Sequence, residues 1–298
     1  MRFLITGANG MLGQDLQRVL AGSEVTALGR AALDVTDGAA FADAAEGHDV
    51  VINAAAYTRV DAAEEDEQTA YAVNALGARN AALAAATHGA RLLQLSTDYV
   101  FDGSASSPYP EDTPLRPLSA YGRTKAEGER LAQQAHPEGS YIVRTAWLYG
   151  AGGPNFVKTM LRLAGERDTV RVVDDQRGQP TWTYDLAQQL ARLAVADAPA
   201  GVYHGTNAGE VTWFGFTREI FRLAGLDPQR VLPTDSTAFV RPAPRPAYSV
   251  LGHGRWAAAG LDVMRPWQEA IAAAFADGAF DPVASGAGSD AAFRVEAP

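Results

Sequence analysis

The chain has 298 residues, 47% of them hydrophobic, so it is long enough for one large or two modest folded domains. Its 35 acidic and 25 basic residues give a formal net charge of -10, which would repel a nucleic-acid backbone or an anionic membrane surface. The absence of cysteine excludes disulfides, thiolate metal sites and thiol catalysis.

The N-terminus has no pattern of a secretory signal, and no apolar run reaches the roughly 18 residues that a membrane span needs. We therefore expect a cytoplasmic protein that binds neither nucleic acid nor membrane.

Predicted strands and helices alternate through the first half of the chain. Strands are expected at residues 2–6, 24–28, 50–53, 91–96 and 141–145, and helices at 11–20, around 69–88 and around 124–135. Because parallel strands need crossover connections, this order predicts an α/β fold with a Rossmann-type, doubly wound parallel sheet.

After residue 150 the alternation loosens, with longer loops and more prolines. Residues 1–150 are expected to form a dinucleotide-binding domain, to which later segments can return. Residues 151–280 are expected to form mainly a smaller substrate-binding domain. Residues 281–298 are rich in small and polar residues and are expected to be a mobile tail.

The first strand is followed by three glycines, Gly7, Gly10 and Gly13, spaced G-x-x-G-x-x-G before the first helix. Glycines at such a turn let a pyrophosphate approach the amide groups of the helix N-terminus. The alternative is an ordinary strand-to-helix turn. The spacing is typical of one branch of dinucleotide-binding enzymes.

The stretch SAYGRTKAEGE carries Tyr121 and Lys125 four residues apart, so both lie on one face of the predicted helix. A free phenol has a pKa of about 10 and exchanges protons poorly near neutrality unless a cation stabilises its anion. Upstream, Thr97 of QLSTDYVFDG ends a strand and offers a hydroxyl to the same substrate oxygen. A chance pair of surface residues is the alternative, and the order of loop, hydroxyl, tyrosine and lysine argues against it.

Together these stretches resemble the extended short-chain dehydrogenases and, within them, the dTDP-4-dehydrorhamnose reductases. The likeness covers about residues 2–274 and is carried by GANGMLGQDL, VINAAAYTRVDAAE, STDYVFDG, YGRTKAEGE, RTAWLYG, NFVKTMLRLA, DDQRGQPTWTYDLA and RPAYSVL. The resemblance implies reduction of the C4 ketone of dTDP-4-dehydro-L-rhamnose to dTDP-L-rhamnose with a nicotinamide cofactor.

Two alternatives stay open. A sister reductase of a dTDP-4-keto-6-deoxysugar, such as a dTDP-dihydrostreptose synthase, shares nearly all of these motifs. A non-catalytic regulatory subunit of the same fold is the other, although Thr97, Tyr121 and Lys125 are all present. The oligomeric state is expected to be a monomer or a homodimer.

The resemblance also assigns roles near the ketone. Tyr121 is expected to donate a proton to the C4 oxygen, and Lys125 to lower the pKa of Tyr121 and hold the nicotinamide ribose. Thr97 would polarise the ketone. Asp98 would bind a sugar hydroxyl or tune the site, or else act only as a loop cap.

The expected cofactor is NADPH, with NADH tolerated. Arg30 at the end of the second strand suits a 2'-phosphate, with a solvated loop cation as the alternative, whereas the resemblance places Asp34 near the adenosine, where it would retain some NADH activity. The residues expected at the cofactor are Gly7, Asn9, Gly10, Met11, Leu12, Gly13, Arg30, Asp34, Val35, Ala54, Ala55, Ala56, Tyr121 and Lys125.

Residues of the second half are expected to bind the sugar nucleotide beside Thr97 and Asp98. Trp147 resembles a substrate-contacting tryptophan, although packing explains it equally well. Asn155 precedes a helix whose N-terminus suits the diphosphate, and Arg245 adds a guanidinium, with Arg241 as its competitor.

No metal site is predicted. His204 is isolated, and the acidic run at residues 64–67 is typical of a solvated helix start. Some members of the family use Mg2+ at a dimer interface, but no local ligand motif here supports it.

Overall fold

The computed structural model describes residues 1–281, so the tail expected over 281–298 falls, except for Asp281, outside the described residues. Its centre is a six-stranded, fully parallel sheet with the order β10-β5-β4-β3-β1-β2. The strands are β1 (Arg2–Thr6), β2 (Glu24–Leu28), β3 (Val50–Asn53), β4 (Arg91–Thr97), β5 (Ser140–Thr145) and β10 (Gly201–His204). The predicted doubly wound α/β fold is confirmed.

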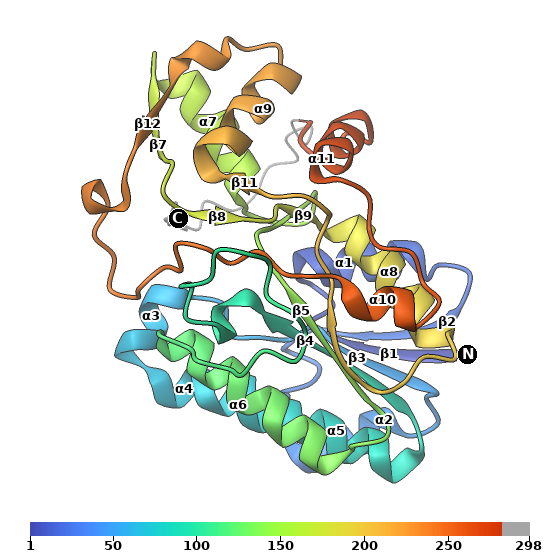
Figure 1. Cartoon of the computed structure of the whole chain (residues 1–298). Coiled ribbons are helices and arrows are strands. Elements are labelled where there is room, and N and C mark those ends of the chain that lie inside the picture. Colours follow the sequence, from blue (N-terminus) through green and yellow to red (C-terminus); the bar gives the residue numbers. More distant parts are fainter. Residues whose placement is uncertain (282–298) are drawn as a thin grey trace.

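Helices cover both faces of this sheet (Figure 1): α1 (Met11–Val19) and α8 (Thr183–Val195) lie above it, and α2 (Gly38–Ala45), α5 (Gly77–His88) and α6 (Ala120–Ala135) below it. Successive strand residues point to opposite faces. Phe3 and Ile5 therefore pack with α1 and α8, whereas Leu4 between them packs with α2 and α5. This double burial explains why consecutive residues of β1 and β3 are apolar rather than alternating with polar ones.

Several short elements lie between β3 and α6 in the chain. They are α3 (Val60–Glu65), α4 (Glu67–Tyr71) and the π-helical turn η1 (Ala72–Leu76) before β4, and the 3-10 turn η2 (Asp98–Val100) after it. α4, η1 and α5 follow one another without a break where one helix is expected. α6 begins at Ala120, earlier than expected, because the Ser119 hydroxyl accepts a hydrogen bond from the Gly122 amide and caps the helix. Tyr121 therefore lies in the first turn of α6.

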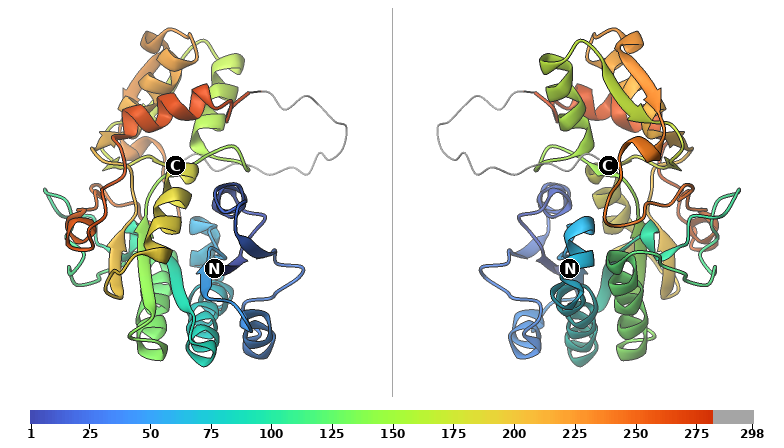
Figure 2. Two further views of the ribbon diagram at one scale, coloured as in Figure 1. Left: turned by 90° about the vertical axis from the view of Figure 1, so that its right-hand side faces the viewer. Right: turned by 90° about the vertical axis from the view of Figure 1, so that its left-hand side faces the viewer.

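A second core forms the upper lobe seen in Figures 1 and 2. There α7 (Phe156–Glu166) and α11 (Trp267–Ala276) pack against α9 (Trp213–Leu223), which lies on the parallel pair β7 (Val170–Val173) and β12 (Val231–Thr234). The smaller elements are β6 (Leu148–Tyr149), β8 (Arg177–Gly178), β9 (Thr181–Trp182), β11 (Val211–Thr212), η3 (Pro228–Arg230), η4 (Ser236–Ala238) and α10 (Gly254–Ala258).

The chain crosses between the lobes several times. Residues 183–204 bring α8 and β10 back to the large sheet, although they lie in the segment expected to be mainly substrate-binding. Near the end, Arg18 of α1 forms an ion pair of 2.6 Å with Asp277, which follows α11. The two-domain division with a boundary near residue 150 stays a proposal. None of the helices in residues 1–281 combines the length and apolar character needed to cross a bilayer.

The close contact between α6 and η1 predicts a sharp sensitivity at Gly128. A Cβ at this position would collide with the carbonyl oxygen of Asn74 in η1. We expect Gly128→Ala to lower the free energy of unfolding by about 1–3 kcal/mol, the usual cost of overpacking. The measurement is the midpoint of urea unfolding.

Gly165→Ala is the matched control, because a Cβ there meets nothing within 4 Å and the residue lies in α7. It should be neutral or stabilise the protein by up to about 1 kcal/mol. Equal effects of the two substitutions would contradict the packing argument.

Candidate active site

The glycine turn between β1 and α1 has the shape that a pyrophosphate requires. Gly7 has φ 69°, and a Cβ on it would lie 2.7 Å from the backbone of Ala54. A Cβ on Gly13 would collide with the Gly7 carbonyl. No side chain caps α1 at Gly10, so the first amide groups of the helix, at Met11, Leu12 and Gly13, are left for an anion.

The expected adenosine contacts follow β2 and β3. The Asn9 amide covers Gly29 at the end of β2 so closely that no Cβ fits there. Arg30 is exposed, Val35 is buried, and Ala54, Ala55 and Ala56 are half-buried after β3.

The Asp34 carboxylate accepts hydrogen bonds from the amide (2.9 Å) and the hydroxyl (2.8 Å) of Thr36. These bonds, with a smaller contribution from Arg30, hold the pKa of Asp34 below its usual value. Asp34 is thus engaged locally in a turn, whereas Arg30 extends into solvent.

Thr97, Asp98 and Tyr121 meet at the carboxyl end of β4. The Thr97 hydroxyl donates to Asp98 Oδ1 at 2.9 Å and accepts from the Tyr99 amide at 3.2 Å. Burial raises the pKa of Asp98 to about 6, against the opposing effect of the Ser249 and Thr97 hydroxyls. Asp98 Oδ2 is buried and makes no hydrogen bond of normal geometry within residues 1–281. It is a polar atom suited to a ligand hydroxyl.

The Tyr121 phenol is held between polar and aromatic neighbours. Burial raises its pKa to about 12, the Thr97 hydroxyl acts to lower it, and the charge of Asp98 to raise it. The ring of Tyr99 stands edge-on to it, with centroids 5.6 Å apart.

Lys125 is 3% exposed, and its ammonium group donates a 2.6 Å hydrogen bond to the Leu95 carbonyl. Burial lowers the pKa of Lys125 to about 8, although the charge of Glu129 acts to raise it. Within residues 1–281 no hydrogen bond joins Lys125 to Tyr121, so the expected lowering of the Tyr121 pKa by Lys125 stays a proposal.

A chain of hydrogen-bonded polar side chains crosses the sheet from β1 to the Leu95 carbonyl, which is also the acceptor for Lys125. The Thr6 hydroxyl donates to Asn53 at 2.6 Å, Asn53 donates to Gln94 at 2.7 Å, and Gln94 donates to the Leu95 carbonyl at 2.9 Å. Gln94 was not expected from the sequence, because a glutamine inside a buried strand has no motif of its own.

Asn74 of η1 is a second unexpected residue. Its side chain accepts from the Tyr57 amide (2.9 Å) and donates to both the Tyr57 carbonyl (3.2 Å) and the Thr124 hydroxyl (3.1 Å). It therefore fixes the loop after β3 to α6 directly beside Lys125. π-Helical turns occur frequently at functional sites, but no sequence pattern predicts this one.

Trp147 has φ 47° and is, within residues 1–281, the only non-glycine residue with positive φ. Its ring stacks on Trp213 with centroids 3.5 Å apart and an angle of 8°. A Cβ at Gly178 would lie 2.5 Å from the indole. Trp147 is thus packed on a neighbouring ring in a strained conformation, which is common at ligand sites, and its contact with substrate stays a proposal.

A groove of about 570 Å3 opens next to this stack, in the upper lobe. It combines four cationic side chains with three aromatic ones and was not predicted. They are Arg162, Arg167, Arg171, Arg241, Phe156, Trp213 and Phe239. Guanidinium groups bind phosphates and aromatic rings stack on bases, so the groove suits a nucleotide.

Asn155 and Arg245 are both committed to other contacts. Asn155 caps α7 by accepting from the Lys158 amide at 3.1 Å, and it donates to the Gly150 carbonyl at 2.8 Å. Arg245 pairs with Asp61 at 3.0 Å, whereas Arg241 lies 3.7 Å from Asp61 and lines the groove. Of the two arginines, Arg241 is the one that the groove can use.

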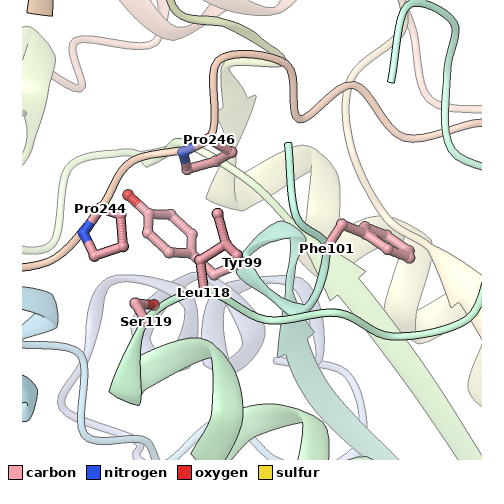
Figure 3. Close-up of a pocket in the computed structure, with 6 residues that line it drawn as sticks. All are labelled: Tyr99, Phe101, Leu118, Ser119, Pro244 and Pro246. Carbon is pink, nitrogen blue, oxygen red and sulfur yellow. The ribbon is translucent and has the colours of Figure 1, made fainter. Parts of the chain in front are cut away.

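Asp61 anchors the proline-rich loop over the site. Burial acts to raise its pKa, but Arg245 and the Ala243 amide outweigh burial and hold it below its usual value. In Figure 3, Pro244 and Pro246 of this loop lie against Tyr99, and Ser119 at the start of α6 lines the same small pocket.

The groups considered for metal binding have other partners. His204 is fully buried, donates from Nδ1 to the Gly252 carbonyl (2.8 Å) and faces Arg144, and its pKa is lowered to about 3. Glu64 accepts from the Ala120 amide, and Glu67 pairs with Arg123, so both hold the start of α6. Within residues 1–281 no three or more His, Asp or Glu side chains form a group that could hold a metal.

Comparisons with known proteins agree with this geometry. A family model described as the RmlD substrate binding domain matches residues 1–279. A dTDP-4-dehydrorhamnose reductase from Streptomyces griseus is 56% identical over 282 residues, covering 92% of this chain and 93% of that protein.

A probable dTDP-4,6-dihydroxy-2-methyloxan-3-one 4-ketoreductase from Streptomyces antibioticus is 50% identical over 282 residues, covering 93% of this chain and 95% of that protein. The crystal structure of dTDP-4-dehydrorhamnose reductase from Bacillus anthracis in complex with NADP has a TM-score of 0.88 and 38% identity, covering 93% of this chain and 99% of that chain.

The anchoring role of Asp61 can be tested by Asp61→Asn. Loss of the charge weakens both the pairing with Arg245 and the bond from the Ala243 amide. We expect hydrogen exchange of a peptide covering residues 236–247, followed by mass spectrometry, to accelerate about tenfold through local opening.

Glu219→Gln, which breaks an exposed ion pair with Arg222 on α9, serves as the control and should leave the exchange of this loop unchanged. Unaltered exchange in Asp61→Asn would show that the loop is held by its prolines alone.

Proposed function

The chain belongs to the RmlD substrate binding domain family, and we propose that it is a dTDP-4-dehydrorhamnose reductase. The match of the family model over residues 1–279 carries this conclusion, and it agrees with the contact between Thr97 and Tyr121 and with the burial of Lys125 one turn further along α6. The protein is an oxidoreductase that converts the C4 ketone of dTDP-4-dehydro-L-rhamnose to the alcohol of dTDP-L-rhamnose.

The reduction of a ketone requires a proton at the oxygen, and we assign its donation to Tyr121. The Thr97 hydroxyl would share the same oxygen, since it already acts on the Tyr121 phenol. After the proton leaves, the phenolate needs a cation. Lys125 is the ammonium one helical turn away, and each unit by which it lowers the Tyr121 pKa corresponds to about 1.4 kcal/mol.

NADPH is the proposed cofactor, with NADH tolerated. When bound, it supplies the hydride. The glycine turn fits its pyrophosphate because the turn has no room for a Cβ at Gly7 or Gly13. Arg30 is exposed at the adenosine end and suits the 2'-phosphate, whereas the Asp34 carboxylate is occupied by Thr36.

For the substrate we propose that the nucleotide occupies the groove beside Trp213 and that the sugar reaches the carboxyl end of β4. Arg241 would contact the diphosphate, and Asp98 Oδ2 a sugar hydroxyl. Trp147 would lie between them, since it stacks on Trp213. Asn155 would then support this site by capping α7, and Arg245 by anchoring the proline-rich loop to Asp61.

A sister 4-ketoreductase is the second candidate, because the Streptomyces antibioticus relative with that name is 50% identical. NMR of the product formed from dTDP-4-keto-6-deoxy-L-mannose separates the two. The cytoplasmic location, the choice between monomer and homodimer, and the absence of nucleic-acid or membrane partners stay predictions.

Tyr121→Phe tests the proton donor. We expect turnover to fall by two or more orders of magnitude while the dissociation constant of NADPH changes little, because only the phenolic proton is removed. Steady-state kinetics with the keto sugar and a fluorescence titration with NADPH provide the two values. Tyr71→Phe, on the exposed side of α4, should behave as the unmodified protein, and retained turnover in Tyr121→Phe would reject the assignment.

Arg30→Glu tests the cofactor preference. A carboxylate there repels the 2'-phosphate, so kcat/KM with NADPH should fall far more than kcat/KM with NADH. Arg222→Glu, at an exposed position of α9, controls for the change in net charge. An unchanged ratio of the two kcat/KM values in Arg30→Glu would rule out recognition through Arg30.

A further inference from the structure

Lys125 and Glu129 lie four residues apart on α6, and both are almost completely buried, at 3% and 2% exposure. Residues at this spacing are neighbours on one helix face. The only hydrogen bond that the described residues give the Lys125 ammonium ends on a neutral carbonyl, that of Leu95. A buried charge with a neutral partner is unfavourable unless a counter-charge lies near.

Glu129 supplies that charge from a fixed position. Its carboxylate accepts hydrogen bonds from Arg144 Nε at 2.9 Å and from the terminal nitrogen of Arg144 at 2.7 Å. The Ser96 hydroxyl donates to it at 2.5 Å. Ser96 follows Leu95 on β4, so one strand holds both the lysine and the glutamate against the sheet.

Arg144 is itself fixed on its far side. It donates to the Glu111 carbonyl at 3.1 Å and faces Nε2 of His204 at 3.3 Å. Since His204 Nδ1 bonds the Gly252 carbonyl, its Nε2 is left to accept from Arg144, and the neutral ring adds no charge. The ionisable side chains around this part of α6 are therefore Tyr121, Glu129 and Arg144, with Asp98 and Tyr99 beyond Tyr121.

We propose that Glu129 is a positioning residue for the reduction: held by Arg144 and Ser96, it keeps the Lys125 ammonium charged beside Tyr121. This inference rests on the proposed function. Because the ion pair with Arg144 fixes Glu129, the carboxylate stays one helical turn from Lys125, where its charge acts to raise the Lys125 pKa.

Two opposing effects on the pKa of Lys125 set the direction of the expected shift in the pH profile. Burial lowers the pKa of Lys125 to about 8, and Glu129 opposes this lowering. Without Glu129 the pKa falls further, so the ammonium loses its proton at a lower pH. In Glu129→Gln the alkaline limb of the kcat/KM profile should shift by about one unit to lower pH. The activity lost at pH 8.5 should be largely regained at pH 6.

The control is Glu127→Gln, which removes an equal charge from the exposed face of the same helix, where Glu127 pairs with Arg130. Its profile should match that of the unmodified protein. Because Glu129→Gln leaves the Arg144 charge unpaired, the double variant Glu129→Gln/Arg144→Met is made in parallel, with both charges removed. It should show the same alkaline shift, and Glu129→Asp should restore most of the original profile.

NADPH binding, measured by fluorescence over the same pH range, gives a readout that needs no sugar. The weakening of binding at alkaline pH should move by the same amount in Glu129→Gln. Two results would show that Glu129 is only structural. One is a loss of activity and binding that is equal at every pH, and the other is an alkaline limb that does not move in either assay. If the unmodified protein binds NADPH but does not reduce the keto sugar, the proposed function fails, while the binding profiles still decide the role of Glu129.

Discussion

The ammonium group of Lys125 is a charge inside the protein, and much of the catalytic half is arranged around it. Its hydrogen bond ends on the Leu95 carbonyl of β4, and the Ser96 hydroxyl of the same strand holds Glu129, so α6 must stay at a fixed distance from β4. Gly128 lets α6 approach η1 closely enough for Asn74 to reach Thr124. A larger residue at this contact would move the lysine as well as the helix.

The proline-rich loop at residues 241–246 lies near Tyr121 on the side of the upper lobe, because its prolines pack against Tyr99. Asp61 lies shortly after the alanines that follow β3, and through Arg245 it ties this loop to the first lobe. Tyr99 then lies between the loop and Tyr121, so the anchor and the phenol are separated by one aromatic ring. The loop is thereby held to the first lobe by an ion pair and lies one aromatic ring away from Tyr121.

Much of the fold follows from local patterns in the sequence. β1, β2 and β3 have the predicted bounds because each is a short segment rich in apolar residues, and β1 and β2 are each followed by a glycine. Thr97, Tyr121 and Lys125 were identified because motif order and helical spacing place them together. The roles of these residues come from the family likeness and stay proposals.

Other parts depend on contacts between distant residues, which no local pattern reports. The groove draws on residues from Phe156 to Arg241, and its arginines look like ordinary surface residues in the sequence. The partner of Arg245 is 184 positions away. Asn155 is expected at the diphosphate because it precedes α7, and this stays a proposal; the structure shows it as the cap of that helix, a position that an asparagine takes with or without a ligand.

The π-helical turn η1 divides one long helical segment into two parts with different tasks. α4 faces the start of α6, and α5 packs its alanines under the sheet. A π-helical turn, with i→i+5 hydrogen bonds, holds about one residue more than an α-helical turn. Deleting a single residue from η1 would therefore let α4 and α5 join in one regular α-helix and remove the widened turn that carries Asn74. This segment tolerates exchanges of side chains far better than changes in length, so insertions and deletions among natural variants of the chain should avoid residues 72–76.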